Sequence, residues 1–194
     1  FGMDPDRVGA PMGVVDRLEA CGERDLILVS GPSRSGKSRW AEHLLGHHPA
    51  VTYVATSDRR PEDPAWQERL RLHRLRRPVA WQLLECGPAL ASGLKTIAAD
   101  RALLIDSLGG FVAWHLELGE SQWHATVQEL LTALQTRKPP VVLVIEETGW
   151  GLVPPTAIGG LFRDRLGALA QHLEGLASRS WLVVQGRAID LHHV

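Results

Sequence analysis

The chain has 194 residues, of which 44% are hydrophobic and 22% charged, and its formal net charge is −1. This length suits one sizeable core, so we expect a single domain over residues 25–194 after an N-terminal extension, residues 1–24, whose first two residues precede Met3 and can be a cloning remnant. No apolar run approaches the roughly 20 residues of a membrane helix, the balanced charge gives no global attraction to nucleic acid, and two cysteines are too few for a disulfide framework. We therefore expect a cytoplasmic protein with no membrane span and no nucleic-acid partner.

Apolar, β-branched runs alternate with helical patterns along the chain. The pattern predicts strands at 26–30, 51–55, 81–85, 102–106, 141–146 and 181–185, with a short antiparallel edge at 189–191. It predicts helices at 37–45, 64–75, 88–99, 111–118, 121–136 and 158–177. Such alternation indicates an α/β fold with a mainly parallel sheet and helices on both faces.

A phosphate-binding pattern follows the first predicted strand. It matches G-x-x-x-x-G-K-[ST] in the required context, and its residues are Gly31, Pro32, Ser33, Arg34, Ser35, Gly36, Lys37 and Ser38. Glycines let successive backbone N–H groups converge on phosphate oxygens, Lys37 would reach the β- and γ-phosphates, and Ser38 would ligate Mg²⁺. The pattern predicts a P-loop NTPase, three-layered and RecA-like, that binds GTP or ATP with Mg²⁺; an ordinary glycine-rich turn is the alternative.

The predicted helix at 64–75 leads into a run of five arginines around one histidine, between residues 69 and 77. On a helix, Trp66, Leu70, His73 and Arg77 share one face. One interpretation is a nucleophilic histidine among guanidinium groups that bind phosphate and disfavour imidazole protonation. The alternatives are a solvated arginine face with His73 packed beside Trp66 and Leu70, and a basic RNA-binding helix.

Ligands of parallel sheets lie at the carboxyl ends of the strands, which makes polar residues there candidates. Glu85 is a candidate nucleotide contact. Asp106 is a candidate for the metal or its water shell, or else a cap of the next helix. Glu146 and Glu147 precede a loop rich in glycine and proline; Glu147 is the candidate catalytic residue, and a plain connecting turn is the alternative. Trp150, between two glycines, is the tryptophan expected to meet a ligand.

These features together resemble the bifunctional adenosylcobinamide kinase / adenosylcobinamide-phosphate guanylyltransferase family of cobalamin biosynthesis. The resemblance runs from about Asp25 to Gly186. It is carried by Gly31–Arg39 with Ala41-Glu42, by Tyr53–Ser57, by His73-Arg74 with Arg77-Pro78 and Trp81, and by Glu147 with Gly149, Gly151, Val153-Pro154 and Phe162–Asp164.

The resemblance implies that His73 attacks the α-phosphate of GTP, releases pyrophosphate and carries GMP to a corrinoid phosphate. It also implies that the phosphate loop serves transfer of a γ-phosphoryl group to the hydroxyl of adenosylcobinamide. Arg39, Arg74 and Arg77 become expected nucleotide contacts, the corrinoid becomes the expected partner, and a homo-oligomer, a trimer, is expected.

Some loops depart from the family pattern. Ser107-Leu108-Gly109-Gly110 stands where the family has Cys-Leu-Thr and later an Asn, and Ile145–Gly149 replaces Thr-Asn-Glu-Val-Gly. Polar groups that could hold the acceptor or the metal are thereby lost. Two other functions therefore stay open: a P-loop kinase or NTPase acting on another small substrate with a structural His73, and a nucleotide-binding regulatory module without turnover.

Overall fold

The computed structural model describes residues 25–58, 60–151 and 154–193. The predicted N-terminal extension lies outside the described residues. A seven-stranded sheet forms the centre of the domain in the order β3-β2-β4-β5-β1-β6-β7. Its strands are β1 (Leu26–Gly31), β2 (Val51–Ala55), β3 (Gln82–Glu85), β4 (Ala102–Asp106), β5 (Val141–Glu146), β6 (Arg179–Val184) and β7 (Arg187–Asp190).

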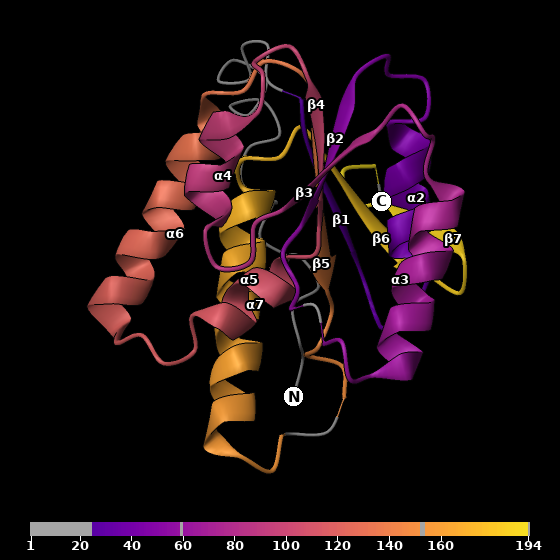
Figure 1. Cartoon of the computed structure of the whole chain (residues 1–194). Coiled ribbons are helices and arrows are strands. Elements are labelled where there is room, and N and C mark those ends of the chain that lie inside the picture. The colour runs from indigo at the N-terminus through magenta and orange to yellow at the C-terminus, as the bar shows by residue number, and fades with distance from the viewer. Residues whose placement is uncertain (1–24, 59, 152–153, 194) are drawn as a thin grey trace, which may run out of the picture.

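All strands run parallel except β7, which pairs antiparallel with β6. Helices cover both faces (Figure 1): α2 (Lys37–Leu44) and α3 (Pro64–Arg76) lie on one side, and α4 (Leu90–Thr96), α5 (Leu108–Trp114), α6 (Glu120–Gln135) and α7 (Ala157–Glu174) lie on the other. The predicted three-layer α/β class is thus confirmed. No helix in the described part of the chain is long and apolar enough to cross a membrane.

Two apolar clusters hold the layers together, one on each face of the sheet. Along β1, Leu26 and Leu28 pack with α4 to α7, whereas Ile27 and Val29 pack with α2. Successive strand side chains point to opposite faces, so a strand buried on both faces must be apolar throughout. This explains the uninterrupted apolar runs in the sequence.

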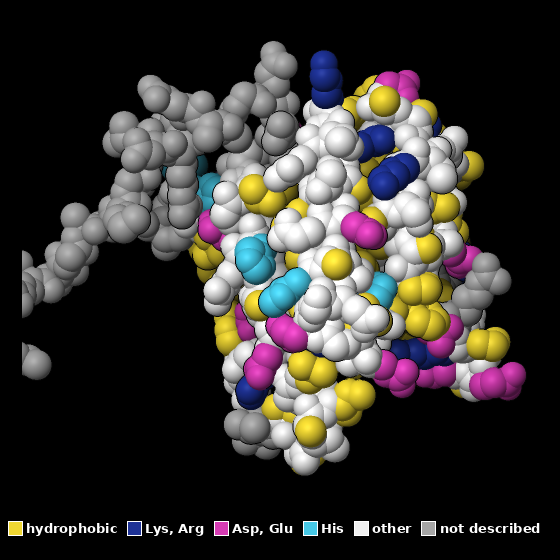
Figure 2. All heavy atoms as spheres, turned by 90° about the vertical axis from the view of Figure 1, so that its left-hand side faces the viewer, with side chains coloured by type: hydrophobic (Ala, Val, Ile, Leu, Met, Phe, Trp, Pro, Cys, Tyr) yellow, Lys and Arg dark blue, Asp and Glu magenta, His cyan; other side chains and the backbone are white. Residues whose placement is uncertain are grey.

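The face covered by α4 and α6 carries a mixture of side-chain types (Figure 2). Its lysines and arginines are scattered among acidic, histidine and hydrophobic side chains. The cluster of arginines that stands out in the sequence lies instead on α3, across the sheet. The arginine cluster is therefore not part of the face shown in Figure 2.

The predicted elements and the observed ones differ mostly at their ends. The helix predicted at 111–118 begins at Leu108 and ends at Trp114, because tertiary packing places Gly109 and Gly110 inside the helix despite their low helix propensity. The helix predicted at 88–99 spans only Leu90–Thr96. The C-terminal edge strand lies at Arg187–Asp190, two residues before the predicted start.

The hairpin of β6 and β7 packs against the phosphate loop. Gln185 and Gly186 form its turn with positive φ angles of 51° and 78°, as a tight right-twisting hairpin requires. The Gly186 N–H donates to the Ser35 carbonyl at 2.8 Å. At Gly31 a Cβ atom would lie 2.3 Å from the Val183 carbonyl oxygen and 2.7 Å from Ser35 Oγ, so only glycine fits there.

We expect Gly31→Ala to destabilise the domain by about 2 kcal/mol or more and to weaken nucleotide binding, because the backbone of β6 must shift to admit a methyl group. Gly167→Ala is the matched control, since Gly167 is helical and a Cβ there meets nothing within 4 Å. We expect it to be neutral or stabilising by up to about 1 kcal/mol. Denaturant unfolding and titration with a fluorescent GTP analogue measure both effects; equal behaviour of the two variants would contradict the assigned contact.

Candidate active site

A cleft of about 300 Å³ opens at the carboxyl edge of the sheet, with α3 forming one of its walls. It brings together most of the side chains that the sequence predicts to be catalytic or to bind nucleotide or metal. Those lining it are Ser33, Lys37, Ser38, His73, Arg74, Arg77, Glu85 and Asp106. The predicted helical face of Trp66, Leu70, His73 and Arg77 lines the same cleft, as the 3.6-residue period requires.

Lys37 begins α2 and is buried at the base of the cleft. Its Nζ donates to the Pro32 carbonyl at 3.2 Å, so the ammonium group lies beneath the curled loop. Burial lowers the pKa of Lys37, while the carboxylates of Glu146 and Asp106 oppose that shift. A cation among these groups can meet incoming phosphate oxygens.

Asp106 ends β4 and accepts a hydrogen bond from the Tyr53 hydroxyl at 3.0 Å. Burial, and then the neighbouring Asp106 carboxylate, raise the pKa of Tyr53 well above its usual range. The guanidinium of Arg77 lies 3.9 Å from the centre of the Tyr53 ring, a cation–π arrangement. Arg77 also donates from Nε to the His73 carbonyl at 3.1 Å, so Asp106, Tyr53 and the end of α3 are linked.

His73 is partly buried in the cleft wall. Burial lowers the pKa of its imidazole; the Asp106 carboxylate opposes this shift, and the guanidinium groups of Arg76, Arg69 and Arg77 reinforce it. Its Nδ1 lies 3.3 Å from Nη2 of Arg76. The ring is therefore neutral at physiological pH, which is the nucleophilic form.

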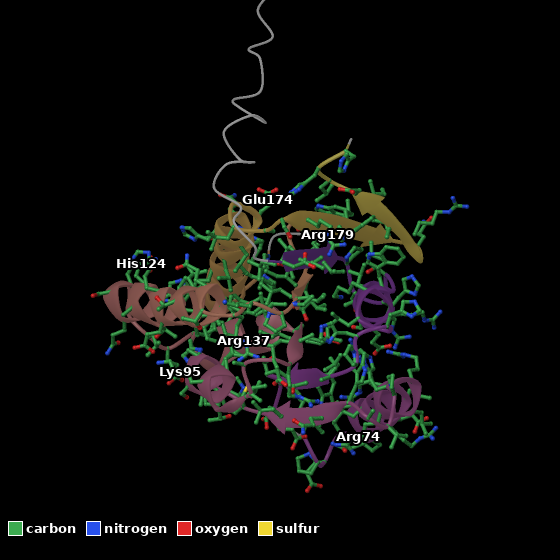
Figure 3. The ribbon with its side chains drawn as sticks, turned by 90° about the horizontal axis from the view of Figure 1, so that it is seen from above. Arg74, Lys95, His124, Arg137, Glu174 and Arg179 are labelled. Carbon is green, nitrogen blue, oxygen red and sulfur yellow. The ribbon has the colours of Figure 1, made fainter. Side chains whose placement is uncertain are left out.

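Beside β3, the cleft wall carries an ion pair between Arg74 and Glu85. Arg74 Nη2 lies 3.9 Å from Glu85 Oε1, and both side chains are substantially exposed. In Figure 3 the labelled Arg74 lies on α3 at the outer edge of the molecule. Such an exposed pair contributes little to stability and leaves the guanidinium able to turn toward an anion.

The two glutamates after β5 have different surroundings. Glu146 lines the cleft and accepts from the Gly109 N–H at 2.9 Å and from the Ser107 hydroxyl. Glu147 does not line it; its Oε1 accepts from the Gly149 N–H at 2.8 Å within its own loop. The sequence made Glu147 the candidate catalytic residue and assigned no role to Glu146. The missing signal is strand register, which pairs Glu146 with Gly31 at the start of the phosphate loop.

Other predicted site residues lie beside the cleft without lining it. Gly31, Pro32, Arg34, Ser35 and Gly36 build the loop backbone, and the side chains of Arg34 and Arg39 are exposed. Trp150 is also exposed and does not line the cleft. Tyr53 and Arg69 do line it, although neither was assigned a role from the sequence. The resemblance included Tyr53 only as part of a strand. Its hydrogen bond to Asp106 could not be predicted from the sequence, because the two residues are 53 positions apart.

Solved structures with little sequence similarity share this fold. An ATPase of a bacterial type III secretion system aligns with a TM-score of 0.54 at 10% identity, covering 85% of this chain and 52% of that one. A protein from Pyrococcus horikoshii OT3 aligns with a TM-score of 0.52 at 8% identity, covering 87% and 85%. The likeness to an ATPase agrees with the predicted P-loop fold.

Sequence relatives are more informative. The bifunctional adenosylcobalamin biosynthesis protein CobU of Salmonella typhimurium is 34% identical over 86% of this chain and 99% of its own length. The bifunctional adenosylcobalamin biosynthesis protein CobP of Pseudomonas aeruginosa is 37% identical over 87% and 96%. The profile of one family, described as cobinamide kinase / cobinamide phosphate guanyltransferase, matches residues 27–191. The chain therefore belongs to the cobinamide kinase / cobinamide phosphate guanyltransferase family.

Proposed function

We propose that this chain phosphorylates adenosylcobinamide and transfers GMP from GTP to adenosylcobinamide phosphate, with His73 as the covalent GMP carrier. The observation that carries this proposal is the position of His73 in the same cleft as Lys37, Ser38 and Asp106. A neutral imidazole next to a phosphate loop is a competent nucleophile toward the α-phosphorus, and nearby guanidinium groups can stabilise the charge that develops there. Arg74 and Arg77 are the proposed nucleotide contacts on the α3 side.

The donor set also fits Mg²⁺. Ser38 supplies a hydroxyl and Asp106 a carboxylate, which are the hard oxygen ligands that Mg²⁺ takes beside substrate phosphates and water. Among the described residues, no group of three or more His, Cys, Asp and Glu side chains could hold a metal ion by itself. When bound, Mg²⁺ would neutralise phosphate charge.

The cleft also has an apolar part of its lining, to which Leu83, Ala113 and Phe162 contribute. Apolar surface of this kind suits a large organic acceptor whose hydroxyl or phosphate reaches the nucleotide. One nucleotide site would then serve both reactions: the γ-phosphoryl group goes to a hydroxyl, and the α-phosphoryl group goes to His73.

Covalent labelling tests the role of His73. We expect α-³²P-GTP with Mg²⁺ to label the protein through a bond that is labile to acid and stable to base, as a phosphoramidate is. His73→Ala should lose this label while it still binds GTP, because the phosphate loop is untouched. His124→Ala is a suitable control, since His124 is an exposed helical histidine on α6. Equal labelling of the His73 variant, or a label stable to acid, would rule out His73 as the carrier.

Label formation should depend on pH with a definite sign. Since the protonated imidazole is not nucleophilic, the rate should rise as pH increases through the pKa of His73 and stay level above it. Because that pKa is lowered from the usual 6.5, we expect half of the maximal rate below pH 6.5. Single-turnover labelling between pH 5 and about pH 9 measures it. A midpoint above 6.5 would show that the ring is not held neutral.

The tandem glutamates can be separated by matched substitutions. We expect Glu146→Gln to slow both GMP labelling and γ-phosphoryl transfer from ATP to adenosylcobinamide by about tenfold or more, because the cleft loses a negative charge that acts on Lys37 and one of the two oxygens that accept from Ser107 and Gly109. Glu147→Gln should stay within about twofold of the parent. The reverse order would support the catalytic role that the sequence predicts for Glu147.

The homo-oligomer implied by the resemblance stays a prediction. Exposed apolar side chains on the α3–β3 side support it, with Leu75 69% exposed, Leu83 47% exposed and Val79 fully exposed. The strand β3 that carries Leu83 is an edge of the sheet, and such edges are often covered by another chain.

A further inference from the structure

Among the described residues, three aromatic side chains line the cleft: Tyr53, Trp66 and Phe162. Tyr53 is buried, its hydroxyl donates to Asp106, and the guanidinium of Arg77 covers its ring. Phe162 packs against the apolar core. Trp66 instead lies half-buried on the first turn of α3. Its indole is therefore the ring that a ligand in the cleft can reach most readily.

This indole is held in one orientation. Its Nε1 donates to the Asp58 carbonyl at 3.2 Å. The backbone N–H of Trp66 donates to Oδ1 of Asp63, the residue that caps α3, at 3.0 Å. Both hydrogen bonds tie Trp66 to the loop between β2 and α3. A flat side chain that is already oriented loses little freedom when a ligand stacks on it.

Two guanidinium groups lie against the same ring. Cζ of Arg60 is 5.0 Å and Cζ of Arg69 is 5.6 Å from the centre of the indole, and both side chains line the cleft. Arg60 has a φ of 41°, which a residue with a Cβ atom adopts only where its surroundings hold it. Its carbonyl accepts from the Asp63 N–H at 3.1 Å and from Gln67 Nε2 at 3.0 Å. The loop thus maintains an unfavourable backbone conformation that places a cation at Trp66.

The spacing along α3 relates Trp66 to His73. The two residues are seven positions apart on one face of the helix, and a rise of about 1.5 Å per residue separates them by about 10 Å along its axis. In the other direction this face ends at Arg77, which packs on the buried ring of Tyr53. A nucleotide with its outer phosphates at Lys37 and its α-phosphate at His73 would therefore extend its ribose and base toward Trp66.

We propose that Trp66 and Arg60 form the guanine subsite of the cleft: the indole stacks on the base, and the guanidinium donates to its O6 and N7. This inference rests on the proposed function, since the guanine is that of the GTP whose α-phosphate His73 would attack. Stacking on an indole tolerates any base, because every base has a π face. Two donors of one guanidinium match O6 and N7 of guanine, whereas adenine has an amino group in place of O6. The subsite therefore prefers GTP and still admits ATP for the kinase reaction.

The two arginines have different tasks in this subsite. The Arg60 side chain is exposed, and a cation–π contact at an exposed position is weak. A base can therefore take its place on the indole, while the guanidinium moves to the edge of the base. Arg69 acts on the phosphate side: besides burial, its positive charge lowers the pKa of Lys37 and of His73. Base recognition is thus assigned to Arg60 and not to Arg69.

Binding of inert nucleotides tests the subsite. The ligands are the α,β-methylene analogues of GTP and ATP, which His73 cannot cleave, and inorganic tripolyphosphate, which has no base. In calorimetric titrations with Mg²⁺, Trp66→Ala should bind the GTP analogue about tenfold or more weakly and tripolyphosphate within about twofold of the parent. Trp66→Phe, which keeps a ring, should lie between the two. Arg60→Gln should weaken the GTP analogue about fivefold or more and the ATP analogue by less than about twofold.

Arg71→Gln is the matched control, because Arg71 lies on the same helix, pairs with Glu68 at the surface and does not line the cleft. It should bind all three ligands as the parent does. An equal loss of tripolyphosphate and GTP analogue in Trp66→Ala, or an equal loss of both nucleotides in Arg60→Gln, would overturn the proposal. So would an unchanged affinity of Trp66→Ala for the GTP analogue with a raised KM for adenosylcobinamide, which would make the indole a platform for the acceptor.

If Trp66→Ala does not fold, Trp66→Leu takes its place, since leucine is apolar and has no π face. Failure of the proposed function would appear as an absent GMP label in a parent that still binds the GTP analogue through Trp66. Failure of this inference would appear as normal labelling of the parent together with an unchanged affinity of Trp66→Ala for the GTP analogue. The two failures are therefore distinguishable.

Discussion

Two carboxylates that end neighbouring parallel strands set the main constraint on this protein. Strand β4 ends in Asp106 and strand β5 in Glu146, and the parallel pairing of the two strands brings both charges to one edge of the sheet. Like charges gathered at one edge disfavour the folded state unless donors and cations surround them. Tyr53 donates to Asp106, Ser107 and Gly109 donate to Glu146, and Lys37 lies in the field of both carboxylates. The groups that line the cleft thus stabilise the two negative charges that the sheet brings together.

The local parts of this arrangement could be predicted from the sequence. The phosphate loop is contiguous and needs only a strand before it and a helix after it, and the face of α3 that carries His73 follows from helical periodicity. Contacts between distant segments could not be predicted in this way. The register that places Glu146 beside Gly31, and the contact of Arg76 with Glu42 across two helices, depend on how layers pack. Periodicity within one element carries no information on either.

The glycine pair at the start of α5 shows how packing can decide a departure from a family pattern. A Cβ atom at Gly109 would lie 2.4 Å from Glu146 Oε2, and one at Gly110 would lie 2.5 Å from Thr56 Oγ1. A side chain at Gly109 would displace the Glu146 carboxylate, and one at Gly110 would also press on the backbone of Thr56 and Ser57. At this wall of the cleft the polar contacts run from the Gly109 N–H and the Ser107 hydroxyl to the Glu146 carboxylate. Both glycines line the cleft, so the proposed kinase reaction takes place against this wall.

The hydrogen bond from Gly186 to Ser35 has a consequence for how the molecule opens. It joins the phosphate loop to a hairpin about 150 residues later in the chain, whose far strand pairs, within the described part of the chain, only with β6. Edge hairpins commonly open at lower free energy than the rest of a sheet. Each opening of β7 would remove a backbone contact from the loop. The local opening equilibrium at the C-terminal edge and the occupancy of the nucleotide site are therefore thermodynamically linked. Nucleotide bound at the phosphate loop should accordingly slow amide exchange in the hairpin.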